Sequence, residues 1–215
     1  MKNCIAPANR NTRRILPIAC ATALAAAFTV SLSHPAHADE VNPPPVPSNI
    51  QVPAGSKAFL VGHAVGTQDY VCLPSGTGVK FVLFTPQATL FNGSDDRELT
   101  THYFSPNPSE GGTIRATWQD SHDTSTVWAS ATATSTDPAF VKPGAVAWVL
   151  LTVVGSQSGP IGSNKLTPTT FIQRVNTSGG LAPSTGCASS ADVGHEEFVP
   201  YTADYFFYKE KNKDR

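Results

Sequence analysis

The stretch Ala145-Val-Ala-Trp-Val-Leu-Leu-Thr-Val-Val154 is almost continuously apolar and has no helical periodicity. Its β-branched and aromatic residues, with little alternation between polar and apolar positions, predict a strand buried on both faces. We therefore expect Trp148 to lie in the core. The segment Tyr201-Thr-Ala-Asp-Tyr-Phe-Phe-Tyr208 also has aromatic side chains on both faces, whereas Thr113-Ile-Arg-Ala-Thr-Trp118 alternates and predicts a strand with one wet face.

Similar short runs recur along the chain at spacings of about ten residues. Turn-forming residues separate them, as in Pro74-Ser-Gly-Thr-Gly78 and Asn92-Gly93, and no helical pattern intervenes. This organisation predicts an all-β, single-domain fold, an antiparallel sandwich or barrel of about ten strands. The expected strands are 58–65, 68–73, 79–84, 88–91, 99–104, 113–119, 127–134, 145–154, 169–176 and 201–208.

Residues 1–38 have the organisation of a secretory signal peptide. Basic residues come first, an apolar run from Ile15 to Leu32 follows, and Ala36-His37-Ala38 has the small-x-small pattern of a cleavage site. Cleavage after Ala38 predicts a secreted or periplasmic protein. The pair Arg13-Arg14 leaves the twin-arginine route open beside the general secretory route.

The rest of the chain divides into a proline-rich linker (39–51), one β domain (52–208) and a charged tail (209–215). Without the four basic residues of the signal, 11 Lys and Arg remain against 16 Asp and Glu. This acidic balance, without a basic patch, argues against nucleic acid as a partner. No later segment is long and apolar enough to span a bilayer, so we expect no stable membrane insertion. The oligomeric state stays open.

Cys72 and Cys187 are the only cysteines beyond residue 38, and neither belongs to a Cys-x-x-Cys motif. We predict a structural disulfide between them, with a thiol active site or metal pair as the alternative. Closing so long a loop stabilises a fold by roughly 4–5 kcal/mol in the chain-entropy model. We expect this bond to fasten the segment 181–199, which has few strand signals, onto the β core.

Motifs for catalysis or cofactor binding are weak. Gly155-Ser-Gln-Ser-Gly159 places Gln157 where a hydrolase nucleophile would stand, and no phosphate loop, dinucleotide fingerprint or zinc helix is present. We therefore expect no cofactor. The segment Asp120-Ser-His-Asp123 is the only polar cluster; it favours a turn capped by aspartate over a metal site, so no metal is expected.

Four side chains are candidates for a polar cleft. His102 and Tyr103 lie on an expected strand, and Asp120 is an acidic partner that would complete a hydrolase or lyase site. His63 is a further candidate from another segment. Trp118, in the alternating strand, is the best candidate for an exposed ring that stacks on a sugar.

Several segments together resemble the exported bacterial and fungal proteins grouped as domain of unknown function 3455. The resemblance implies secretion and a single domain, and it brings no activity or cofactor. The segments that carry it are Gln68-Asp-Tyr-Val-Cys72, Phe84-Thr-Pro-Gln-Ala-Thr-Leu90, Thr101-His-Tyr103, Val127-Trp-Ala129, Phe171-Ile-Gln-Arg-Val-Asn-Thr-Ser-Gly-Gly180, Gly186-Cys187 and Tyr201-Thr-Ala-Asp-Tyr-Phe-Phe-Tyr208.

The resemblance makes Gln173 and Arg174 candidates for a shared site together with His102 and Tyr103. Arg174 lies on an apolar strand, where a buried guanidinium needs a carboxylate or several carbonyls around it. We expect a structural ion pair between Arg174 and Asp204.

These observations predict a non-enzymatic binding module for a carbohydrate or another cell-surface component. A secreted hydrolase or lyase that uses His102, Tyr103 and Asp120 is the rival, and a structural surface protein without a ligand is the third possibility. A cleft that gathers His63, His102, Tyr103 and Asp120 would favour the enzyme.

Overall fold

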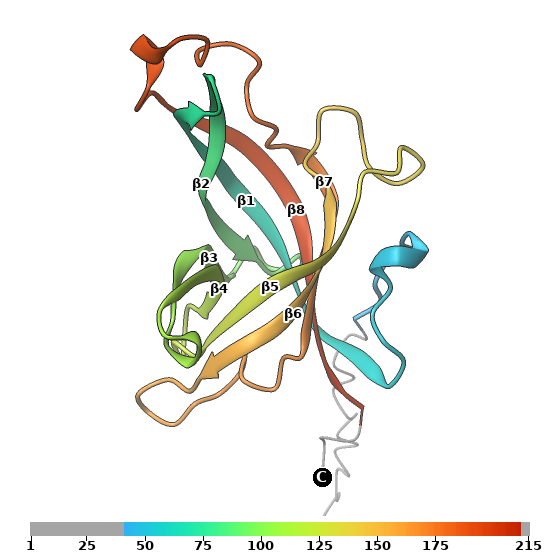
Figure 1. Ribbon diagram of the computed structural model, residues 1–215. Helices are drawn as coiled ribbons and strands as arrows, with labels where there is room; N and C mark the ends of the chain where they lie inside the picture. The colour runs from blue at the N-terminus through green and yellow to red at the C-terminus, as the bar shows by residue number, and fades with distance from the viewer. Residues whose placement is uncertain (1–40, 212–215) are drawn as a thin grey trace, which may run out of the picture. The chain divides into compact units, whose positions relative to one another are not determined.

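Residues 41–211 are described by the computed structural model, and their eight strands form a closed antiparallel barrel (Figure 1). Each strand pairs with the next one along the chain, and the last strand pairs with the first. The strands are β1 (Ser56–Ser75), β2 (Gly78–Phe91), β3 (Glu98–Asn107), β4 (Thr113–Asp120), β5 (Thr126–Ser135), β6 (Trp148–Gln157), β7 (Phe171–Gly179) and β8 (Glu196–Glu210). Three short 3₁₀ helices are η1 (Ser48–Ile50), η2 (Pro108–Glu110) and η3 (Ser190–Asp192).

The all-β prediction is confirmed, and of its two architectures the chain adopts the barrel. The expected signal peptide and the end of the expected tail lie outside the described residues. Within residues 41–211 no helix is long and apolar enough to cross a bilayer.

The chain has eight strands rather than the ten expected, because two pairs of expected strands are each one continuous strand. The segments 58–65 and 68–73 both belong to β1, and 79–84 and 88–91 both belong to β2. Gly66 lies inside β1 and pairs with Ala88 of β2. A Cβ at Gly66 would lie 2.0 Å from the Gln87 carbonyl oxygen, so glycine here allows two strands to approach closely rather than turning the chain. Pro86 likewise stays within β2, close to the register shift between Asp69 and Tyr70 of β1.

The predicted disulfide between Cys72 and Cys187 is present, with the two Cα atoms 5.5 Å apart. It holds the loop that follows β7 against β1, next to the tip of the β1–β2 hairpin (Figure 1). Backbone hydrogen bonds reinforce the contact, because Cys72 N–H donates to the His195 carbonyl and Gly194 N–H donates to that of Cys72. The loop was predicted to extend to residue 199, but it ends earlier, because β8 begins at Glu196 and pairs with β1 from that residue on.

Two groups of buried side chains lie on opposite faces of the barrel wall. One contains Trp118, Tyr205 and Phe207. The other contains Ile50, Val141, Trp148, Leu150 and Phe206, so the prediction that Trp148 is a core residue is confirmed. Val41, Val46 and Val52 pack against this second group, and the proline-rich stretch thus lies on the barrel.

The ladder between β2 and β3 is short. It runs from Phe91 opposite Glu98 to Ala88 opposite His102. Beyond that point the remainder of β2 continues along β1, away from β3 and β4 (Figure 1). Thr85 Oγ1 accepts a hydrogen bond from the Phe104 N–H there, which is a single bridge in place of a ladder. This part of the wall borders the cavity described next.

Candidate functional site

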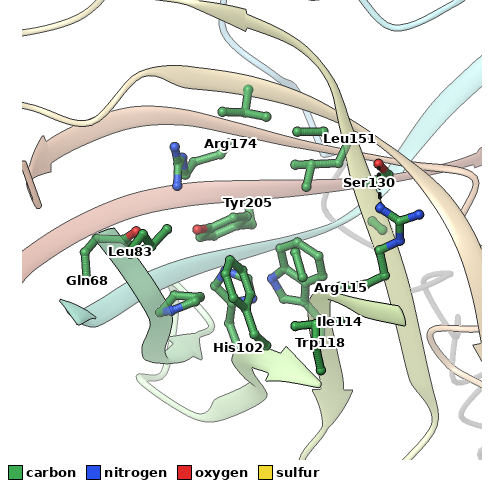
Figure 2. A pocket seen from close by; sticks show the side chains of 16 residues that line it. Gln68, Leu83, His102, Ile114, Arg115, Trp118, Ser130, Leu151, Arg174 and Tyr205 are labelled. Atoms are coloured by element: carbon green, nitrogen blue, oxygen red, sulfur yellow. Dashed lines mark hydrogen bonds between the residues drawn. The ribbon is translucent and has the colours of Figure 1, made fainter. Parts of the chain in front are cut away.

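A cavity of about 250 Å³ lies between the strands of the barrel (Figure 2). Sixteen residues line it, most of them aromatic or aliphatic, and none is acidic. At its rim Ile114 is 57% exposed and Leu83 is 36% exposed, close to the gap between β2 and β3. The other lining residues are Gln68, Pro86, His102, Phe104, Arg115, Ala116, Trp118, Ala129, Ser130, Ala131, Val149, Leu151, Arg174 and Tyr205.

Stacked rings form one wall of the cavity. His102 and Trp118 are cross-strand partners in β3 and β4, and their rings are parallel within 7° with centroids 4.1 Å apart. Tyr205 of β8 lies edge-on to Trp118, at 5.5 Å between centroids. Trp118 is only 1% exposed, so the expectation of an exposed ring is wrong. Alternation shows which side chains of a strand share a face, but not which face is covered.

His102 is a neutral imidazole. Its Nδ1 lies 2.9 Å from the Thr117 carbonyl oxygen and therefore donates the hydrogen bond. Burial, which is the largest effect, and the nearby charge of Arg174 together lower the pKa of His102 to about 3, against the opposing effect of the hydrogen bond to the Thr117 carbonyl. The second nitrogen, Nε2, consequently carries a lone pair and can accept a hydrogen bond.

Two arginines border the cavity in different electrostatic states. Arg115 is paired with Glu110 through two hydrogen bonds, of 2.8 Å from Nε and 2.7 Å from Nη2. These bonds, together with one from the Asn107 amide, lower the pKa of Glu110 to about 2, so the pair stays ionised. Arg174 instead donates from Nε and Nη2 to a single acceptor, the Ala147 carbonyl oxygen, at 3.2 and 2.9 Å.

The expected ion pair between Arg174 and Asp204 does not form. Arg174 is opposite Tyr205 in the β7–β8 ladder, whereas Asp204 is opposite Val175. Facing residues of an antiparallel pair share one side of the sheet, and their chain neighbours point to the other side. Arg174 and Tyr205 therefore point into the cavity, and Asp204 points outward.

Asp204 belongs to a separate outer cluster with His63, its cross-strand partner in β1. The Nδ1 of His63 lies 2.6 Å from Asp204 Oδ1, and the Asn176 amide donates to Oδ2 at 2.7 Å. His63 also borders a shallow surface pocket beside Gly93. His63 is therefore remote from the barrel cavity and outside the expected cleft.

Asp120 and Tyr103 do not join His102 in the cavity. Asp120 Oδ1 accepts the backbone N–H groups of His122 and Asp123, and its Oδ2 lies 3.0 Å from Lys165 Nζ, so the turn expected for 120–123 is confirmed. Tyr103 is partly buried, which raises its pKa, and it borders an outer depression between β2 and β3 that His102 also lines. Among residues 41–211 no group of three or more His, Cys, Asp or Glu side chains has the arrangement of a metal site.

Gln173 is a structural anchor for the proline-rich stretch. Its amide donates to the Ile50 carbonyl oxygen at 2.7 Å, and its side-chain oxygen accepts the Tyr208 hydroxyl at 2.8 Å. Burial raises the pKa of Tyr208 to about 12, so this hydroxyl keeps its proton. Gln173 thus lies on the outer side of the wall from which its neighbour Arg174 points inward.

Two cavity residues were missed as site candidates at the level of sequence. Gln68 is 2% exposed, and its Nε2 has no partner of hydrogen-bond geometry although the Tyr201 hydroxyl is close by. Tyr205 presents its ring, and its hydroxyl lies 3.3 Å from that of Tyr201. Both residues fall within segments that carry the family resemblance, which was the available signal. The indole Nε1 of Trp118 is also buried without a partner.

Comparison with known proteins identifies the family of the chain but gives no information on its activity. No curated protein and no solved structure matches the chain significantly. The family described as "Protein of unknown function (DUF3455)" matches residues 53–209, which includes all eight strands except the final residue of β8. The chain therefore belongs to the DUF3455 family of proteins of unknown function.

Proposed function

We propose that this protein is a non-enzymatic binding module that holds a small, largely apolar molecule inside its barrel. The observation that carries the proposal is the cavity itself, about 250 Å³ in volume, with buried donor groups of Gln68 and Trp118 left unpartnered at its wall. Buried polar groups in native proteins are nearly always hydrogen-bonded, so such groups indicate a missing partner.

The volume indicates the size of the ligand. An engineered apolar cavity of about 150 Å³ binds benzene, and pockets for drug-sized ligands begin at about 300 Å³. The present cavity lies between these limits, so it suits one aromatic ring with a short substituent or a short alkyl chain. The ring wall of His102, Trp118 and Tyr205 supplies apolar contact area for such a body.

A carbohydrate ligand is less well supported than a small apolar one. Sugars bind where an aromatic ring presents an open face, and Trp118 is buried and stacked on His102. The hydrolase alternative is not supported either. His63, Tyr103 and Asp120 lie outside the barrel cavity, and the outer depression that Tyr103 shares with His102 has no acidic residue in its lining. Binding without turnover is therefore the simpler function for this barrel.

The rim residues indicate the route into the cavity. Leu83 and Ile114 are exposed apolar side chains beside the part of the wall where β2 and β3 are not paired. Apolar groups at an opening favour approach of an apolar ligand. We place the mouth of the site here, between β2 on one side and the β3–β4 hairpin on the other.

Secretion belongs to the same proposal. The disulfide between Cys72 and Cys187 supports it, because such bonds persist in oxidising compartments. N-terminal sequencing of the protein from culture medium or periplasm tests it, with Asp39 as the expected first residue. Retention of the intact chain in the cytoplasm would contradict secretion and leave the cavity proposal unaffected.

The binding proposal is tested by titration with toluene, indole and benzyl alcohol, followed by the indole N–H resonance of Trp118 in NMR spectra. We expect millimolar or tighter binding and a shift of this resonance. The variant Ala129→Leu fills the cavity and should weaken binding at least tenfold, because Ala129 is buried at its wall. Ala139→Leu, on an exposed loop, is the matched control and should bind like wild type.

Two results would contradict the proposal. Equal binding to wild type and Ala129→Leu would place the site elsewhere on the molecule. Absence of binding for the whole set of probes would make the cavity a packing void and would favour the structural surface protein. A glycan array screened in parallel tests the carbohydrate alternative directly.

A further inference from the structure

We infer that the ligand of the barrel is a small monocarboxylate, with its anionic group bound by Arg174 and Gln68 and its apolar body along Trp118 and Tyr205. This inference rests on the proposed binding function and adds the chemical class of the ligand. It follows from the charges and donors at the cavity wall.

Within the described part of the chain, Arg174 is a cation without a carboxylate partner. No acidic residue lines the cavity, and none of the ion pairs between residues 41–211 includes Arg174. A guanidinium has five N–H donors, and two of those on Arg174 point at one carbonyl oxygen. A partly buried guanidinium without a carboxylate is costly, because desolvation of the charge is not offset by a partner.

Arg115 provides an internal comparison. It borders the same cavity, and Glu110 binds it with two hydrogen bonds on the fork of its guanidinium. The chain thus supplies a carboxylate for one arginine of the cavity and leaves the other without one. An external carboxylate at Arg174 would reproduce the bidentate geometry that Glu110 provides at Arg115.

The buried side-chain groups without a hydrogen-bond partner that belong to the lining of this cavity are also donors. They are Gln68 Nε2 and Trp118 Nε1. The carboxylate of Asp69 is buried without a partner as well, but Asp69 is not one of the lining residues. The carboxamide of Gln68 and the hydroxyl of Tyr205 lie on the same side of the cavity as the Arg174 guanidinium, away from Arg115 (Figure 2). A carboxylate accepts several hydrogen bonds and donates none, so it complements this set.

Other ligand charges fit less well. A cation would be repelled by Arg174, and a neutral ring would leave the guanidinium without a partner. A phosphate dianion requires more than one positive charge, and the second arginine is already neutralised by Glu110. One uncompensated cation beside a mainly apolar cavity therefore matches one carboxylate on an apolar body.

The experiment measures affinities for benzoate, phenylacetate and hexanoate, and for the neutral analogues benzamide, benzyl alcohol and hexanol, at pH 7 by calorimetry or NMR. We expect each carboxylate to bind wild type at least tenfold more tightly than its neutral analogue. Arg174→Gln should remove this preference, and Arg174→Lys should retain part of it because the charge remains while the fork is lost. Arg97→Gln, at an exposed site on the surface, is the control and should leave all affinities unchanged.

Each alternative outcome is informative. If neutral and charged probes bind wild type equally, the inference is wrong and the proposed binding function stands. If no probe binds, both are wrong. If the preference survives Arg174→Gln, another group holds the anion and the assignment to Arg174 is overturned. Should Arg174→Gln fail to fold in a melting experiment, the comparison of Arg174→Lys with wild type decides between these outcomes.

Discussion

His102 and Trp118 are direct neighbours across the β3–β4 ladder, and their rings are stacked within 7° of parallel inside the barrel. This contact combines ordinary cross-strand pairing with one wall of the barrel cavity. Trp118 also meets Tyr205 and Phe207 edge-on. The stack therefore joins β3 and β4 to β8 across the interior, and its members contribute to both stability and the shape of the site.

Truncation of this stack should be strongly destabilising. Trp118→Ala removes a fully buried indole and should lower the free energy of unfolding by about 3–5 kcal/mol, measured in urea. Trp118→Phe retains part of the ring contacts and should cost less than the alanine variant. A loss below about 1 kcal/mol for Trp118→Ala would contradict its burial at the centre of the barrel.

Acid should destabilise the protein through His102. Burial holds the pKa of folded His102 at about 3, well below its ordinary value of 6.5. Between these values the unfolded state binds the extra proton, so the free energy of unfolding falls as the pH falls. The contribution is about 1.4 kcal/mol for each pH unit, or roughly 2 kcal/mol by pH 5.

Comparison of variants isolates this effect. His102→Gln should reduce the decline in unfolding free energy between about pH 6.5 and 5, measured by denaturant titration. His122→Gln, an exposed histidine in the turn after β4, should decline like wild type. Glu110 acts in the same direction only below its ordinary pKa of 4.5, outside this window. Parallel profiles for wild type and His102→Gln would show that His102 is not held neutral.

Reduction of the disulfide should loosen the loop after β7. The bond between Cys72 and Cys187 closes a loop with a sequence separation of 115 residues. Its loss should lower the free energy of unfolding by roughly 2–5 kcal/mol and raise amide exchange in residues 181–195. Unchanged melting in reductant, with free thiols confirmed chemically, would contradict this prediction.

Gly66→Ala should disrupt the pairing of β1 with β2. The added methyl group would lie 2.0 Å from the backbone oxygen of Gln87, and a backbone atom cannot move away as a flexible side chain can. We expect poor folding or a loss of several kcal/mol of stability. Gly78→Ala is the matched control, because no atom lies within 4 Å of its Cβ, and it should melt like wild type. Equal melting temperatures for the two variants would contradict the close approach at Gly66.

The sequence allowed prediction of the strand class, the disulfide and most strand positions, because these depend on local patterns and on a single pair of thiols. The predicted number of strands was too high, because glycine and proline often occur in turns. Gly66 and Pro86 therefore coincide with breaks in the prediction, although both lie within strands. Their role depends on the strand that passes beside them, and a pattern along one segment contains no information about that neighbour.

The candidate site was predicted only in part for a similar reason. His102, Trp118 and Arg174 meet at the cavity, whereas His63, Tyr103, Asp120 and Gln173 lie outside it. The expected ion pair between Arg174 and Asp204 does not form because side chains alternate along β8. Tyr205 therefore points into the barrel beside Arg174, and Asp204 points outward. Which face of a strand points inward depends on closure of the barrel, and closure is a property of all eight strands together.

Closure of the barrel also has a consequence for biosynthesis. Because β1 pairs with β8, the first strand to leave the ribosome has its second neighbour in the last strand to be made. One edge of the nascent sheet therefore has unsatisfied backbone groups until β8 has been synthesised, a situation that favours association with other chains. We expect cotranslational protection of this edge, rather than the speed of any local step, to limit the yield of folded protein in a foreign host.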